Sequence, residues 1–133
     1  MYKQHRTSNG HHPVVLVIDD NSAIRDMVSW ALELDGFEPA EAAEGQEALD
    51  WVHNAAREGR YPAVILLDLA MPGMDGQTFL RQLQKQWVVS NPLPAVIVIT
   101  AGAGHDANKL DVQQVITKPF HVRDLLDVVR QWS

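Results

Sequence analysis

The sequence predicts a single α/β domain with a five-stranded parallel sheet and helices on both faces. Three observations support this prediction. Short, branched apolar runs recur along the chain, patterns of helical period separate them, and most of the runs end in a polar side chain. The 133 residues, 46% of them hydrophobic, suit one domain with a sizeable core. We expect residues 13–133 to form this domain and the polar residues 1–12 to form a flexible arm.

Five apolar runs are predicted to be strands. They are residues 14–18, 37–42, a run ending at Asp68, 95–99 and 114–117. Most are continuous, rich in branched residues and bounded by turn formers, which is typical of strands buried on both faces of a sheet. The run over 37–42 is more polar and suits an edge of the sheet. Because helical patterns separate the strands, the strands should be parallel and joined by right-handed crossovers.

Helical spacing of apolar residues follows four of these runs. The first predicted helix begins at Asn21-Ser22, which can cap a helix, and stops at Gly36. The other three cover residues 45–59, 77–87 and 121–132. Residues 101–111 contain two glycines and predict at most a short helix.

Composition and charge narrow the functional classes. A formal net charge of −6 argues against a nucleic-acid-binding surface, which needs clustered Lys and Arg. No apolar run is long enough to cross a bilayer, and no signal peptide is recognisable. The lack of cysteine excludes disulfides, a thiol nucleophile and thiolate metal sites. We therefore expect a cytoplasmic protein that itself binds neither nucleic acid nor membrane.

Polar side chains end four of the predicted strands: Asp19 and Asp20, Asp68, Thr100, and Lys118. Because the carboxyl ends of parallel strands share one edge of a sheet, we expect these side chains to meet there. Three neighbouring carboxylates repel one another, and a divalent cation relieves that repulsion. Oxygen ligands favour Mg²⁺, with Mn²⁺ as the alternative, over zinc.

A hydroxyl and an ammonium group opposite such a metal suit the oxygens of a phosphoryl group, whose charge needs several fixed donors during transfer. A carboxylate beside the metal can be the nucleophile and form an aspartyl phosphate. Each residue also has a structural alternative. Asp68 could simply start a turn, Lys118 could be a solvated turn residue, and Thr100 could be an ordinary strand residue.

Four motifs, in this order, resemble those of the receiver domains of two-component response regulators. They are Asp19-Asp20, Asp68-Leu69-Ala70-Met71-Pro72-Gly73-Met74-Asp75-Gly76, Ile99-Thr100-Ala101 and Thr117-Lys118-Pro119-Phe120. The resemblance spans about residues 14–132, nearly the whole chain. It implies the flavodoxin-like strand order 2-1-3-4-5. It also implies a cis peptide bond before Pro119.

The resemblance further implies that Asp68 accepts a phosphoryl group from a sensor histidine kinase or a histidine phosphotransfer protein. Asp20 would bind Mg²⁺ directly and Asp19 would support it, while Asp68 and the backbone carbonyl of Ala70 would complete the protein's share of the coordination. Such a domain promotes its own phosphorylation and dephosphorylation without being a turnover enzyme. Phosphorylation would then switch binding to an output partner, which the sequence does not identify.

The stretch from Thr100 to Lys118 matches the family in its chemistry and departs from it in its length. By the resemblance, the Thr100 hydroxyl and the Lys118 ammonium bind phosphoryl oxygens. Receivers usually have Tyr or Phe three residues before this lysine, where this chain has Val115. The stretch is also shorter than usual by about one helical turn. We therefore expect a fourth helix that is short or irregular, and an output surface that switches differently.

Other functional classes fit the residues less well. Residues 102–107 formally match a dinucleotide fingerprint, but they lie in the fourth unit, and the next strand ends in Lys118 instead of an acidic ribose partner. A haloacid-dehalogenase-like phosphatase needs a D-x-D motif, which Asp19-Asp20-Asn21 lacks. The main alternative is a receiver-like interaction module with vestigial phosphorylation chemistry. Both a stand-alone receiver and a domain of a larger regulator or hybrid kinase fit the sequence.

Overall fold

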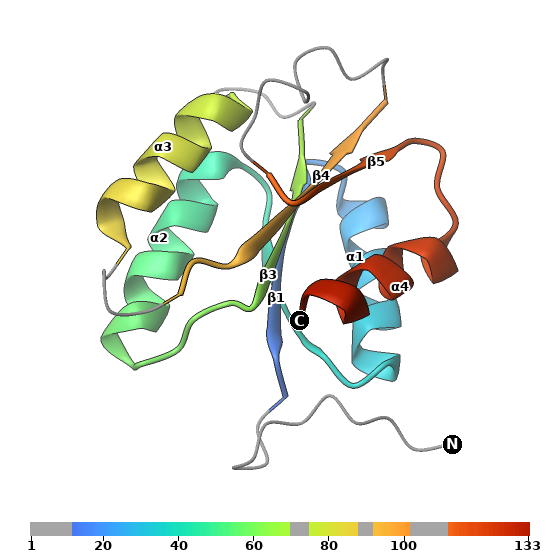
Figure 1. The fold of residues 1–133 in the computed structure, drawn as a ribbon, viewed down its shortest axis with the longest axis horizontal. Coiled ribbons are helices and arrows are strands. Elements are labelled where there is room, and N and C mark those ends of the chain that lie inside the picture. The colour runs from blue at the N-terminus through green and yellow to red at the C-terminus, as the bar shows by residue number, and fades with distance from the viewer. Residues whose placement is uncertain (1–11, 70–74, 88–91, 102–111) are drawn as a thin grey trace.

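The computed structural model describes residues 12–69, 75–87, 92–101 and 112–133, which form a sheet between two layers of helices (Figure 1). The strands are β1 (Val14–Ile18), β2 (Glu38–Ala42), β3 (Val64–Asp68), β4 (Ala95–Thr100) and β5 (Gln114–Thr117). The helices are α1 (Ser22–Leu34), α2 (Gly45–Arg57), α3 (Gly76–Gln86) and α4 (Val122–Trp132). These bounds agree with the predicted elements to within a few residues.

The sheet has the predicted topology. Its strand order is β2-β1-β3-β4-β5, and every neighbouring pair is parallel. The more polar β2 lies at an edge, as its composition predicted, because an edge strand buries less of its surface and tolerates Pro39. The register places Asp68 beside Ile99 and Thr100 beside Thr117. The carboxyl ends of β3, β4 and β5 therefore lie side by side.

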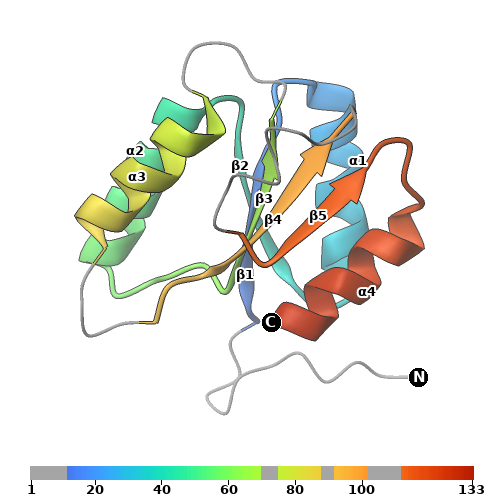
Figure 2. The same cartoon turned by 45° about the horizontal axis from the view of Figure 1, so that its top comes forward.

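Each face of the sheet has its own hydrophobic core. Figure 2 shows α2 and α3 on one side of the strands and α1 and α4 on the other. Because side chains alternate along a strand, neighbouring residues of β1 and β3 enter opposite cores. The core beneath α2 and α3 includes Leu16, Ile18, Ile65, Leu67 and Phe79. The core beneath α1 and α4 includes Val15, Val17, Leu66, Leu125 and Val129. All residues of β1 and β3 are buried, which accounts for their continuous apolar sequence.

The helix ends follow the sequence signals. The Asn21 side chain caps α1 by accepting a hydrogen bond from the Ile24 N–H at 3.1 Å. Two glycines with positive φ, Gly36 at 92° and Gly59 at 74°, follow the ends of α1 and α2. In that left-handed region a side chain is strained, so glycine is favoured where the chain leaves a helix.

Several predictions fall on parts of the chain outside the described residues. This group consists of residues 1–11 of the expected arm, Ala70, and the expected short helix within residues 101–111, of which only Ala101 is described.

The cis bond between Lys118 and Pro119 is present, as the resemblance implied. In the part of the chain that the structure describes, no helix is long and apolar enough to cross a membrane.

Candidate functional site

Asp68 is a buried carboxylate at the centre of the carboxyl edge of the sheet. It ends β3, between β1 and β4, and is only 2% exposed. Pairing continues past it, since the Leu69 N–H donates to the Ile99 carbonyl at 3.1 Å. The Lys118 Nζ lies 3.2 Å from Asp68 Oδ2 and forms an ion pair with it. A buried charge needs such a partner, because removal from water is costly for an isolated carboxylate.

Two further carboxylates lie beside Asp68. Asp19 and Asp20 follow β1, and each of these three residues has a carboxylate oxygen within 4.8 Å of the others'. Asp19 is buried and Asp20 is exposed. The Asp19 carboxylate accepts a hydrogen bond from the Asn21 N–H at 2.9 Å. Burial raises the pKa of Asp19 above its ordinary value, and the negative charge of Asp68 adds to that rise.

The donor set fits a hard divalent cation. Three carboxylates face the single ammonium of Lys118, so the described groups at this edge carry an excess of negative charge. All the candidate ligand atoms are oxygens, which suits Mg²⁺ better than zinc. The exposed position of Asp20 would let water fill further places around such an ion, as Mg²⁺ requires.

Thr100 and Lys118 are brought together by the pairing of β4 with β5. Thr100 ends β4, and its carbonyl accepts a hydrogen bond from the Lys118 N–H at 2.7 Å. Lys118 directly follows β5, and its long side chain extends to Asp68. Of the predicted site residues, Asp19, Asp20, Asp68 and Lys118 thus converge through their side chains. Thr100 lies at the same edge, and Ala70 is outside the described residues.

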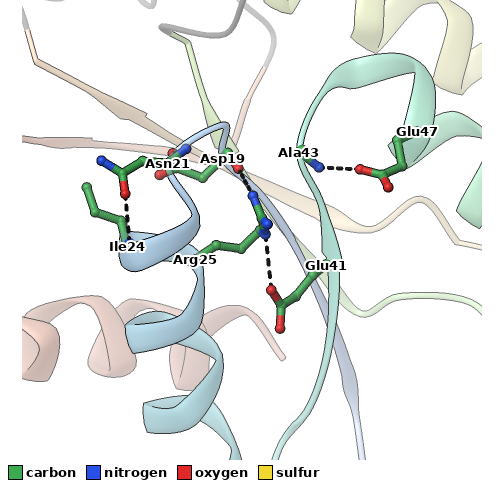
Figure 3. A network of polar contacts seen from close by, with 7 residues as sticks. All are labelled: Asp19, Asn21, Ile24, Arg25, Glu41, Ala43 and Glu47. Carbon is green, nitrogen blue, oxygen red and sulfur yellow. Dashed lines mark hydrogen bonds and ion pairs between the residues drawn. The ribbon is translucent and has the colours of Figure 1, made fainter.

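Arg25 is a residue at this edge that the sequence reasoning missed. From α1, its Nη1 donates to the Asp19 carbonyl oxygen at 2.7 Å, and its Nε donates to Glu41 Oε1 at 3.1 Å (Figure 3). A signal was present in the sequence. A positive charge near the start of a helix is unfavourable because the N-terminal end of the helix dipole is also positive. An arginine there suggests a stabilising partner outside the helix.

With this geometry established, comparison with known proteins identifies the class. The family model for the response regulator receiver domain matches residues 15–130, so the chain belongs to that family. A phosphate regulon transcriptional regulatory protein PhoB from Pseudomonas aeruginosa is 36% identical over 117 residues, which cover 84% of this chain and 48% of that protein. A protein-glutamate methylesterase/protein-glutamine glutaminase from Cereibacter sphaeroides is 39% identical over 118 residues, covering 84% and 30%. The chain thus spans about half the length, or less, of these curated relatives.

Solved structures show the same fold. The chemotaxis protein CheY4 of Vibrio cholerae superposes with a TM-score of 0.76 at 27% identity, covering 91% of this chain and 98% of that chain. The CheX-CheY-BeF3-Mg complex from Borrelia burgdorferi contains a chain with a TM-score of 0.79 at 25% identity, covering 96% and 94%. The receiver class and the strand order predicted from the sequence are therefore confirmed.

Membership of the family carries general properties. Receiver domains accept a phosphoryl group, bind Mg²⁺ at a cluster of Asp residues and are generally not turnover enzymes. They interact with histidine kinases, phosphotransfer proteins and output domains. The cluster of Asp19, Asp20 and Asp68 has the composition that such a site requires.

Proposed function

We propose that this chain is a Mg²⁺-dependent phosphoacceptor in which Asp68 takes a phosphoryl group from a histidine kinase or a histidine phosphotransfer protein. One observation carries the proposal. The buried strand-end carboxylate of Asp68 has two further carboxylates beside it and an ammonium group 3.2 Å away. This arrangement offers a nucleophile, cation ligands and a phosphoryl-oxygen donor within one small space.

The transfer is a single displacement at phosphorus. A carboxylate oxygen of Asp68 forms an O–P bond while the N–P bond of the donor's phosphohistidine breaks, and the electron pair of that bond stays on the imidazole nitrogen. Lys118 and the Thr100 hydroxyl are assigned to the phosphoryl oxygens. Fixed donors there stabilise charge that is spread over those oxygens during transfer.

The cation ligands are assigned to the carboxylates of Asp19, Asp20 and Asp68 and to the backbone carbonyl of Ala70. A bound Mg²⁺, or Mn²⁺, would supply positive charge that offsets the repulsion between Asp68 and an incoming phosphoryl group. The mutual proximity of Asp19, Asp20 and Asp68, each with a carboxylate oxygen within 4.8 Å of the others', supports this assignment. The similar Borrelia burgdorferi structure, a CheX-CheY-BeF3-Mg complex, supports this assignment by similarity.

Mass spectrometry of the intact protein tests the proposal. The full chain is incubated with acetyl phosphate and Mg²⁺, with the Asp68→Asn variant and a chelated sample alongside. We expect a phosphoryl adduct on the wild-type chain with Mg²⁺, and none on Asp68→Asn or after chelation. Asp50→Asn, an exposed carboxylate on α2, is the matched control and should be labelled like the wild type.

The rival function is a receiver-like interaction module with vestigial chemistry. A folded wild-type chain that neither binds Mg²⁺ nor acquires the adduct would favour that rival.

We infer, in addition, that phosphorylation switches binding to an output partner. The usual aromatic position of the family is occupied here by Val115, which is half-buried on β5 and packs toward the α2–α3 core. The switch would therefore operate without an aromatic side chain at that position.

The remaining assignments are predictions from the sequence alone. They are a receiver domain over residues 13–133, a cytoplasmic location, and no direct binding of this chain to nucleic acid or membrane. A pull-down of phosphorylated and unphosphorylated chain, followed by identification of what each retains, would test the partner class directly.

A further inference from the structure

We infer that Arg25 is a positioning residue that orients the Asp19-Asp20 turn for cation binding. The inference rests on the proposed function, because it takes Asp19, Asp20 and Asp68 as the cation ligands. It goes further by assigning a role to Arg25 of α1, which contacts the backbone carbonyl of Asp19 and the side chain of Glu41.

The contacts of Arg25 join three elements at the edge of the site. Its side chain is largely buried, with 18% exposed, between α1 and the end of β2. Nη1 donates to the Asp19 carbonyl at 2.7 Å, and Nε donates to Glu41 Oε1 at 3.1 Å. Figure 3 shows the guanidinium lying between the turn after β1 and the Glu41 side chain. The planar guanidinium holds its donors in a fixed arrangement, so it fixes the distance between these two acceptors.

The bond to the Asp19 carbonyl affects two ligands at once. That oxygen belongs to the peptide unit that joins Asp19 to Asp20. Because a peptide unit is planar, holding its oxygen restricts the orientation of the Cα atoms on both sides. Rotation of this plane would turn the two carboxylates relative to Asp68, so Arg25 acts on the site through the backbone.

Other bonds hold the rest of the same turn. The Asp19 N–H donates to the Ala42 carbonyl at 3.1 Å, which ties the end of β1 to β2. The Asn21 N–H binds the Asp19 carboxylate, and the Asn21 side chain caps α1. Arg25 adds the bond to the carbonyl between the two aspartates, and Glu41 holds the guanidinium toward β2.

Charge and positioning predict opposite effects on Mg²⁺ affinity. If Arg25 acted only as a nearby positive charge, it would repel Mg²⁺, and its removal would tighten binding. If Arg25 positions the turn, its removal must weaken binding, because the ligands lose their arrangement. The sign of the change therefore distinguishes the two roles.

Calorimetric titration of the full chain with Mg²⁺ measures this sign. We expect Arg25→Gln to raise the Mg²⁺ dissociation constant by about tenfold, the scale seen when groups that orient metal ligands are removed. Arg25→Lys keeps the charge, but its single ammonium does not reproduce the planar fork. It should therefore also weaken binding, which a pure charge role would not produce. If Arg25→Gln does not fold, Arg25→Lys still distinguishes a positioning role from a pure charge role.

Arg60→Gln is the matched control. Arg60 forms an ion pair with Glu38 at the opposite end of β2, so its loss removes a comparable interaction far from the carboxyl edge. Its dissociation constant should equal that of the wild type. Two results would overturn the inference about Arg25 and leave the proposed function standing. They are Mg²⁺ affinity at or above the wild-type level in Arg25→Gln, and unchanged Mg²⁺ affinity in Arg25→Lys. A wild-type chain that binds no Mg²⁺ would overturn the proposed function, and this inference with it.

Discussion

Two ion pairs, one at each end of the sheet, use the same elementary interaction for different purposes. Lys118 pairs with Asp68 at the carboxyl edge, and Arg130 of α4 pairs with Asp35 at the end of α1. Both pairs combine a buried carboxylate, with 3% and 8% of its side chain exposed, with a partly exposed cation. Their geometry differs. Arg130 donates two hydrogen bonds to Asp35, at 2.7 and 3.0 Å, whereas the Lys118 Nζ lies 3.2 Å from Asp68 Oδ2.

The difference separates a structural ion pair from an ion pair at the proposed reactive site. The bidentate pair joins α4 to α1, and the hydrogen bond to Asp35 raises the pKa of Arg130. The carboxylate of Asp68 has two further aspartates beside it as well as the Lys118 ammonium, so several charged groups meet at this edge. Under the proposed function, Asp68 exchanges part of this contact for a metal ion or a phosphoryl oxygen, whereas the bidentate pair holds α4 against α1.

Replacing Lys118 should have the largest effect, and the effect should fall on chemistry. Lys118→Met removes a donor assigned to the phosphoryl oxygens. We expect the rate of adduct formation from acetyl phosphate to fall by about 100-fold, as for loss of one oxyanion donor. Time-resolved mass spectrometry measures that rate. Lys85→Met, an exposed lysine on α3, should leave it unchanged. A rate for Lys118→Met close to that of the wild type would remove the distinction between the two pairs.

Breaking the second pair should affect stability instead. Arg130→Ala leaves the buried Asp35 carboxylate without its bidentate partner, and we expect the free energy of unfolding to fall by about 2 kcal/mol. Urea denaturation followed by circular dichroism measures this change, and the rate of phosphorylation should stay at the wild-type level. Asp127→Ala is the control. Its contact with Arg130 is exposed, so it should cost less than about 0.5 kcal/mol.

The smallest expected effect concerns pH. Burial and the neighbouring Asp68 raise the pKa of Asp19, so the ionised form of Asp19 destabilises the folded state at neutral pH. This cost disappears as the pH falls through the raised pKa toward the ordinary value. Without Mg²⁺, Asp19→Asn should therefore increase the free energy of unfolding at pH 7 by about 1 kcal/mol.

Denaturation at a series of pH values tests this expectation. The gain from Asp19→Asn should shrink in acid, because the wild-type carboxyl is then already protonated. Asp50→Asn, at an exposed position on α2, should show no such gain. A gain that is the same at every pH would indicate that the charge of Asp19 is not its cause.

Periodicity and motif order were enough to predict most of the fold. The continuous apolar runs of β1 and β3, the polar edge strand β2, and the glycines after α1 and α2 are local signals, and each depends on a few adjacent residues. The strand order and the roles at the carboxyl edge came from resemblance to receivers. Alternation of strands and helices predicted a parallel sheet, and a parallel sheet brings strand ends to one edge whatever their separation in the chain.

The partners of long charged side chains could be known only from the tertiary structure. Arg25 could have met any of the many carboxylates in this acidic chain, and the sequence contains no local pattern that selects Asp19 and Glu41. Arg130 and Asp35 are likewise brought together by the packing of α4 against α1. Packing also decided that Asp19 is buried while the adjacent Asp20 is exposed. Such pairings depend on distances across the fold, and local sequence patterns contain no information about those distances.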